Sequence, residues 1–279
     1  PLDELGLNVD LVTELYRLSE GDPLLVELYV KELWQRGEMV TRLQPEDLQR
    51  IQPGYKGYFA RWWAEQEKLW GNDDPLSKTL VSTLLDVLAM ALGPLLLTDV
   101  RQLLPTPFSS RELRRAIRSL HRFVVGDGGE QGIAFAHPKL GEYFRDELDV
   151  DEQATWQARF LAWGERTIVE LQGRQLRPCD VSRYLMLYYC THLVEAKADI
   201  EKMLPLASWE WMQISYESTG TYAGFLQDVD RIWKQLQEIN EVATKHEQQA
   251  PYIGYEVLCA LCHASVNTVA DNTLDELLV

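Results

Sequence analysis

Apolar residues recur at helical spacing in the middle of the chain. Leucines occupy every fourth position of residues 80–92, which places them on one face of a helix, and the Gly-Pro pair that follows ends the pattern. Thr98 has a side chain suited to capping a short helix that runs to residue 104. Ser109 and Glu112 have the spacing of a capping box. The helix that they begin has an apolar stripe of Leu113, Ile117 and Leu120. We therefore predict three successive helices.

Two short β-prone runs follow, at residues 123–125 and 133–135, with the glycine-rich loop 126–132 between them. Glycines supply the positive φ values that tight connections need, so this pattern predicts a hairpin. Pro138 suits the first position of a further helix, where its missing N–H costs nothing. The order helix, helix, helix, hairpin, helix is that of a winged helix, which we expect over residues 75–148.

The N-terminal part predicts two helices, at residues 9–20 and 24–34, joined by a tight junction. Gly21 ends the first helix, Asp22 is the N-cap of the second, and Pro23 takes its first position. This junction is explained locally, without any ligand.

The remaining apolar patterns are helical too. Residues 55–70 carry aromatic side chains at helical intervals, and the polar segment 71–75 predicts a linker. Beyond residue 149 the expected helices are 151–171, 179–198, 199–204, 207–217, 222–244 and 252–269. Short links between successive helices favour a helical bundle or the start of a solenoid. We expect a mainly α chain with a small helical domain at 1–74, a winged-helix domain at 75–148 and a helical region at 149–279.

Composition and charge narrow the class of partner. The chain of 279 residues is 46% hydrophobic with nine tryptophans, which is typical of a folded protein, and has a net charge of −16. Residues 76–148 contain nine Lys and Arg against eight Asp and Glu, a net charge of +1, so the remainder carries −17. Such an acidic chain repels nucleic acid and anionic membranes unless its basic groups are segregated.

The setting that the sequence indicates is cytoplasmic. The four cysteines lack the spacing of a disulfide framework, and we find neither a signal peptide nor a run of 18 apolar residues. Because the chain begins with Pro1 rather than Met, we expect it to be an excised piece.

Elements of an ATPase site are missing from the sequence. No G-x-x-x-x-G-K-[ST] occurs, and no apolar strand ends in the paired acids that hold Mg²⁺. The loop 126–132 carries Asp127 and Glu130 and no lysine, so we interpret it as a wing tip rather than a phosphate cradle. We expect that this chain is not an enzyme by itself, and we expect neither a cofactor nor a metal in it.

Cys259, Cys262 and His263 match the C-x-x-C-H spacing of haem attachment. The match lies within an apolar helical run, and c-type haem attachment needs an export route that this sequence does not show. We therefore favour a plain helix. A zinc site is no better supported, because no second Cys/His pair has suitable spacing.

The third predicted helix of the winged helix carries a basic face. Its members are Arg111, Arg114, Arg115, Arg118 and Arg122. A winged helix that reads DNA inserts this helix into the major groove. Because the whole domain has a net charge of only +1, we favour a solvated face and do not expect nucleic acid as a partner.

Three stretches of the sequence resemble the regulatory half of STAND-class NTPases, the signal-transduction ATPases that include NACHT and apoptotic ATPase-like proteins. They are LSEGDPLLVELYVKEL at 18–33, YFARWW at 58–63 and FAHPKLGEYF at 135–144. The later phrases RYLMLYYCTHLVEA and GTYAGFLQDVDRIW look like helical regions seen downstream in bacterial members.

The resemblance implies roles for two residues. Pro23, in a Gly-x-Pro motif, would pack against the adenine of a nucleotide held on a P-loop domain, and His137 would contact the β-phosphate of ADP. The sequence departs from the family at Pro138, where members carry an acidic residue. From the residues alone, we interpret His137 as a histidine at a strand–helix junction whose ring is hydrogen-bonded to a backbone carbonyl.

The resemblance thus predicts a regulatory switch and coupling segment of a bacterial STAND NTPase. ADP or ATP would be bound only by the full-length protein. The partners would be the P-loop domain of the same polypeptide, a sensor ligand and an effector domain, with homo-oligomers on activation and no membrane. The alternatives are a DNA-binding winged-helix regulator with an acidic helical partner domain, and a helical scaffold without a ligand.

Overall fold

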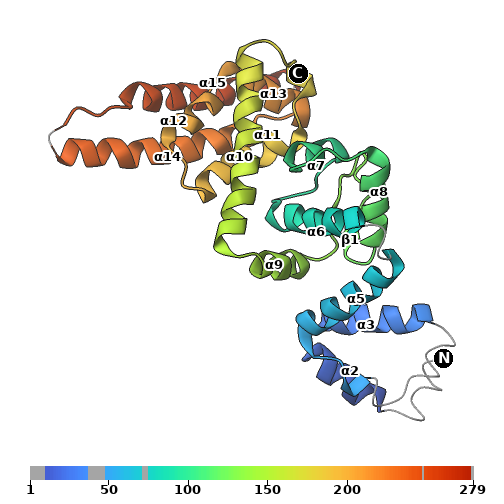
Figure 1. Cartoon of the computed structure of the whole chain (residues 1–279). Helices are drawn as coiled ribbons and strands as arrows, with labels where there is room; N and C mark the ends of the chain where they lie inside the picture. The colour runs from blue at the N-terminus through green and yellow to red at the C-terminus, as the bar shows by residue number, and fades with distance from the viewer. Residues whose placement is uncertain (1–9, 37–47, 71–74, 247, 278–279) are drawn as a thin grey trace. The chain divides into compact units, whose positions relative to one another are not determined.

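The computed structural model describes residues 10–36, 48–70, 75–246 and 248–277. Within these residues the chain is mainly α-helical, and its two strands form one small sheet (Figure 1). The predicted fold class, a mainly α protein, is confirmed.

The elements follow the chain in a simple order. Up to the helix after the sheet they are α2 (Leu11–Ser19), α3 (Pro23–Arg36), α5 (Gly54–Trp70), α6 (Pro75–Met90), α7 (Leu97–Leu103), α8 (Ser110–Ser119), β1 (Val124–Val125), β2 (Ala134–Phe135) and α9 (Pro138–Glu147). The later elements are α10 (Val150–Gln172), η2 (Pro178–Asp180), α11 (Arg183–Glu195), α12 (Ile200–Met203), η3 (Leu204–Leu206), α13 (Trp209–Thr219), α14 (Ala223–Lys245) and α15 (Ile253–Leu277).

The chain forms two compact units. The first comprises Pro1–Leu85, Phe108–Asp127 and Phe135–Glu147, and the second comprises Asp86–Pro107, Gly128–Ala134 and Leu148–Val279. The predicted domain boundaries at residues 74 and 148 stay predictions, and residues 71–74 of the predicted linker lie outside the described residues. The expected order of helix, helix, helix, hairpin and helix is present from α6 to α9, while the winged-helix arrangement itself stays a prediction.

The predicted junction between the first two helices is confirmed. α2 ends at Ser19, its C-cap Glu20 has a φ of 54°, and Gly21 follows with a φ of 78°. Asp22 Oδ1 accepts the backbone N–H groups of Leu24 at 2.9 Å and Leu25 at 3.3 Å, so Asp22 caps α3, and Pro23 is its first residue.

Aromatic side chains form the core of the first unit. Phe123, which precedes β1, contacts Phe59 and Trp62 of α5 with ring centroids 4.9 Å and 4.8 Å apart. Phe59 also contacts Tyr143 of α9 at 4.9 Å and Phe144 at 4.7 Å. These contacts attach α9 to α5, because large buried rings contribute much of the hydrophobic free energy of a small core.

α8 begins with the capping box that the sequence predicts. The Ser109 and Glu112 side chains each accept the other residue's backbone N–H, which is a capping box. The predicted apolar stripe of Leu113, Ile117 and Leu120 is buried. The glycines at both ends of the following loop, Gly126 and Gly132, have φ values of 80° and 71°, as the hairpin prediction requires.

In the second unit one predicted cap is wrong. Thr98 is not the N-cap of α7, because the helix starts at Leu97 with Leu96 as its N-cap, and the Leu96 N–H donates to Asp99 Oδ2 at 3.0 Å. Leu95, just before this helix, pairs with Ile133 through two backbone hydrogen bonds of 3.0 Å and 2.7 Å.

Most later helices match their predictions, but two differ in extent: α15 continues to Leu277, beyond the expected end at residue 269, and α11 ends at Glu195 rather than at residue 198. The helix expected over 179–198 begins at Arg183, since Ser182 Oγ caps it by accepting the Tyr184 N–H at 3.1 Å, and the residues before it form η2. α14 and α15 lie side by side (Figure 1). The interpretation as a bundle or the start of a solenoid stays a prediction.

Candidate functional site

The Gly21–Pro23 junction is a surface feature of the first unit. Pro23 is exposed and Asp22 is half-buried. Partial burial raises the pKa of Asp22, but hydrogen bonds from Lys139, Leu25 and Tyr55 outweigh this effect and hold the pKa below its ordinary value. The Asp22 carboxylate is therefore an ionised group that several elements share.

His137 lies directly before α9 and is exposed. Its Nδ1 accepts the backbone N–H of Lys139 at 3.2 Å. In the neutral ring the proton is then on Nε2, because a nitrogen that accepts a hydrogen bond carries no hydrogen. The imidazole can thus donate from Nε2 to an acceptor outside the helix. The alternative interpretation of His137, a histidine at a strand–helix junction, predicted a backbone carbonyl as the hydrogen-bond partner of the ring. The partner of Nδ1 is instead the backbone N–H of Lys139.

The structure brings the two motifs together, although they are more than a hundred residues apart in the sequence. Lys139 Nζ lies 2.7 Å from Asp22 Oδ2. Tyr55 Oη of α5 donates to Asp22 Oδ1 at 3.1 Å, and the Tyr55 and Tyr143 rings stack at 5.6 Å. The Lys31 ammonium holds the pKa of the Glu27 carboxyl on α3 below its ordinary value, and His137 makes a smaller contribution in the same direction.

This cluster, which we call the junction site, consists of Asp22, Pro23, Tyr55, His137 and Lys139. The sequence pointed to Pro23 and His137 by family resemblance and to Asp22 only as a helix cap. Lys139 and Tyr55 were missed, because neither spacing nor periodicity indicates a contact between such distant segments. The one available signal was that Lys139 is two residues from His137 in the family-like stretch.

The chemistry of the junction site suits binding rather than catalysis. It offers one imidazole N–H donor and one ammonium group, with carboxylates beside them. Among the described residues, no group of three or more His, Cys, Asp or Glu side chains is arranged to hold a metal ion.

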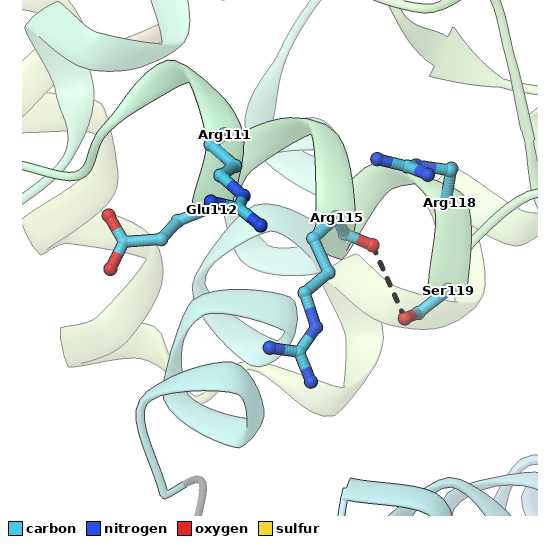
Figure 2. A pocket seen from close by; sticks show the side chains of 5 residues that line it. All are labelled: Arg111, Glu112, Arg115, Arg118 and Ser119. Atoms are coloured by element: carbon cyan, nitrogen blue, oxygen red, sulfur yellow. Dashed lines mark hydrogen bonds between the residues drawn. The ribbon is translucent and has the colours of Figure 1, made fainter.

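The second predicted site is the arginine face of α8. Arg111, Arg114, Arg115 and Arg118 are exposed. Three of them, with Glu112 and Ser119, line a pocket of about 630 Å³, and Figure 2 shows their side chains extending from the helix. Ser119 Oγ donates to the backbone carbonyl of Arg115 at 3.4 Å (Figure 2).

Arg122 has different surroundings from the other four arginines. It follows the end of α8, is half-buried, and lies 3.8 Å from the carboxylate of Glu32, which is 4% exposed. Arg61 Nη2 binds the same carboxylate at 2.6 Å and stacks on the Tyr29 ring at 5.2 Å. A buried carboxylate needs such partners, so Arg122 contributes to the interior of the first unit.

The cysteine motif lies within α15, as the helix interpretation predicts. Cys259 is fully buried, and burial raises the pKa of its thiol to about 11; burial also raises the pKa of Cys262. His263 Nε2 lies 2.8 Å from Asp230 Oδ1 of α14. Thiols that are held protonated are poor metal ligands and poor nucleophiles.

Two buried polar networks of the second unit were not found in the sequence. Tyr184 Oη lies 2.8 Å from His192 Nε2, and this imidazole stacks on Phe160 at 4.5 Å. Asp228, 3% exposed, accepts hydrogen bonds from Trp211 at 3.3 Å and Arg231 at 3.1 Å. Both networks link neighbouring helices, and we interpret them as structural.

A cleft of about 440 Å³ lies among α7, α10 and the segment 176–183 of the second unit. Its lining mixes the guanidinium groups of Arg166 and Arg183 with the carboxyl groups of Asp99 and Glu170. This mixture favours no single class of ligand.

None of the helices described for this chain has both the length and the apolar character needed to cross a membrane. Comparisons with protein-family models, with curated proteins and with solved structures found no match to this chain.

Proposed function

We propose that this chain is the regulatory switch and coupling segment of a STAND NTPase. The junction site would close over ADP held on a P-loop domain outside this chain, with Pro23 against the adenine and His137 on the β-phosphate. The proposal is carried by one observation: Pro23 and His137 belong to a single cluster, joined by the 2.7 Å contact between Lys139 and Asp22.

The tautomer of His137 supports a phosphate contact. Because its Nδ1 is occupied by the Lys139 N–H, the Nε2–H is the group available to a ligand. A hydrogen bond to a charged oxygen contributes roughly 1.5–3 kcal/mol. Such a bond, made only in the closed state, biases the equilibrium towards the ADP-bound resting form.

Exchange of the nucleotide would release the junction site and start oligomerisation and activation of an effector domain. The helical region after α9 would relay the binding of a sensor ligand, and the setting would be cytoplasmic. The sequence has no phosphate-cradling loop and no Mg²⁺-holding acids, so we propose that the chain does not hydrolyse ATP by itself.

The test is a substitution in a longer polypeptide that includes the P-loop domain. His137→Ala should increase spontaneous ADP release and signal-independent activity by about 10- to 150-fold, the range that the lost hydrogen bond allows. ADP retention is measured by filter binding after dilution.

The matched control is His121→Ala, because His121 is also exposed and lies in the same unit. Its removal should leave ADP release unchanged. Unchanged release in His137→Ala, at normal thermal stability, would show that His137 is only a junction residue.

A second candidate function is DNA binding through α8. The observation that favours it is the group of exposed arginines around the pocket of Figure 2. The net charge of the chain, −16, opposes it, because an acidic surface repels a polyanion.

A further inference from the structure

The contact between Lys139 and Asp22 differs from the other ion pairs of the junction region. Lys31 pairs with Glu27 one turn away on α3, and Arg17 pairs with Glu14 within α2. The Lys139–Asp22 pair instead joins the start of α9 to the start of α3, over a sequence separation of 117 residues. It is therefore an ion pair that couples the two motif segments.

We propose that Lys139 is a positioning residue of the junction site, which holds the His137 imidazole beside the Gly21–Pro23 turn. The functional consequence of this positioning rests on the function proposed above, while the positioning itself is a property of this chain.

Lys139 makes two contacts in different directions. Its backbone N–H donates to His137 Nδ1 at 3.2 Å, which orients the ring, and its Nζ binds Asp22 Oδ2 at 2.7 Å. One residue thus contacts both the imidazole and the Asp22 side chain of the turn. A shift of the first turn of α9 would move both groups together.

The two carboxylate oxygens of Asp22 make different contacts. Oδ1 caps α3 and accepts the Tyr55 hydroxyl, whereas Oδ2 takes Lys139. Loss of Lys139 therefore leaves the cap of α3 and the Tyr55 contact in place. The ion pair can break without unfolding either helix.

The surroundings strengthen this pair relative to an ordinary surface pair. The Asp22 side chain is 19% exposed and that of Lys139 is 48% exposed. The stacked Tyr55 and Tyr143 rings lie beside it, and burial raises the pKa of Tyr143 to about 12. Partial exclusion of water reduces the screening of the two charges.

The test uses amide hydrogen exchange in the 279-residue chain without nucleotide. The reporters are the N–H of Val26, bound to the Asp22 carbonyl at 3.0 Å, and the N–H of Leu140, bound to the His137 carbonyl at 3.0 Å. Lys139→Gln should speed exchange at Val26, and Asp22→Asn should speed exchange at Leu140, each about 2- to 10-fold. Asn keeps the N-cap, so the second change removes only the charge.

Three further variants serve as controls for the hydrogen-exchange experiment. Lys139→Arg should restore slow exchange at both amides, and the double variant Lys139→Gln with Asp22→Asn should be no faster than either single variant. Lys31→Gln, which removes the pair within α3, should leave Leu140 unchanged. A Lys139→Gln effect confined to Leu140, or no rescue by arginine, would overturn the inference.

The outcome is independent of the test of function. Unaltered exchange in all variants would overturn the role of Lys139 and leave the phosphate role of His137 standing. Unaltered ADP release in His137→Ala would overturn the proposed function and leave the ion pair standing.

Discussion

At the scale of single residues, burial sets the acid–base behaviour of two aspartates in the second unit. Burial, with a smaller contribution from the nearby Glu152, raises the pKa of Asp86 to about 6. Burial also raises the pKa of Asp228 to about 6, although hydrogen bonds from Trp211 and Arg231 oppose this effect. In both cases the ionised form is less stable in the folded chain than in water.

The sign of the resulting pH dependence follows from linkage. The folded-state pKa of Asp86, about 6, lies above its ordinary value of 3.8, so the folded state binds the proton more tightly. The contribution to stability is therefore fully present below about pH 4 and is lost as the pH rises through about 6.

The substitution Asp86→Asn should remove the loss of stability that accompanies ionisation of Asp86. We expect the variant to be more stable than the parent at pH 7.5, by up to about 3 kcal/mol, and to gain less stability on acidification to pH 5. Urea unfolding at both pH values measures this, with Asp146→Asn as the exposed control. A variant that is less stable at pH 7.5 would contradict the assignment.

At the scale of elements, one glycine allows two helices to approach. A Cβ at Gly164 of α10 would lie 2.0 Å from Cε2 of Tyr189 on α11, and that tyrosine is 1% exposed. By contrast, a Cβ at Gly224 of α14 would meet Ser215 Oγ at an ordinary 3.5 Å.

Gly164→Ala and Gly224→Ala should therefore have opposite effects. Overpacking at residue 164 should cost roughly 1–3 kcal/mol, more than the gain of up to about 1 kcal/mol in helix propensity. Gly224→Ala should be neutral or stabilising, because only the propensity term acts. Thermal unfolding monitored by circular dichroism compares the two, and a stable Gly164→Ala variant would show that α10 and α11 do not approach so closely.

At the scale of the whole molecule, the charge distribution limits binding to nucleic acid. The exposed arginines of α8 belong to a chain with a net charge of −16. A polyanion is therefore repelled by most of the surface and attracted by one helix face.

DNA binding through α8 should be weak, salt-sensitive and without sequence preference. With four exposed arginines, the slope of log K against log salt concentration should be no steeper than about −4. Arg114→Glu with Arg118→Glu should abolish the binding, while Lys56→Glu with Lys68→Glu, an equal change of charge on α5, should reduce it less. Sub-micromolar binding to one duplex at physiological salt, lost only in the arginine variant, would favour the DNA-binding function instead.

Features that depend on a few neighbouring residues could be predicted from the sequence. The capping box of Ser109 and Glu112, the cap by Asp22 and the positive φ values of the loop glycines are set within about four residues of chain. Amphipathic periodicity likewise predicted most helices, because one face of each must be buried. Thr98 shows the limit of such local prediction. It is not the cap of α7, because the helix begins before it and Asp99 accepts the N–H of the N-cap residue Leu96.

Contacts between distant segments were decided by the tertiary structure alone. The family resemblance pointed to Pro23 and His137, but the sequence did not show that Lys139 and Asp22 join their segments, nor that Glu32 lies beside Arg122. Periodicity tells which face of a helix is buried, whereas the partner of that face depends on how the helices pack. The sequence by itself therefore determined most helices and several of their caps, which depend on neighbouring residues, and the packing decided which charged groups meet.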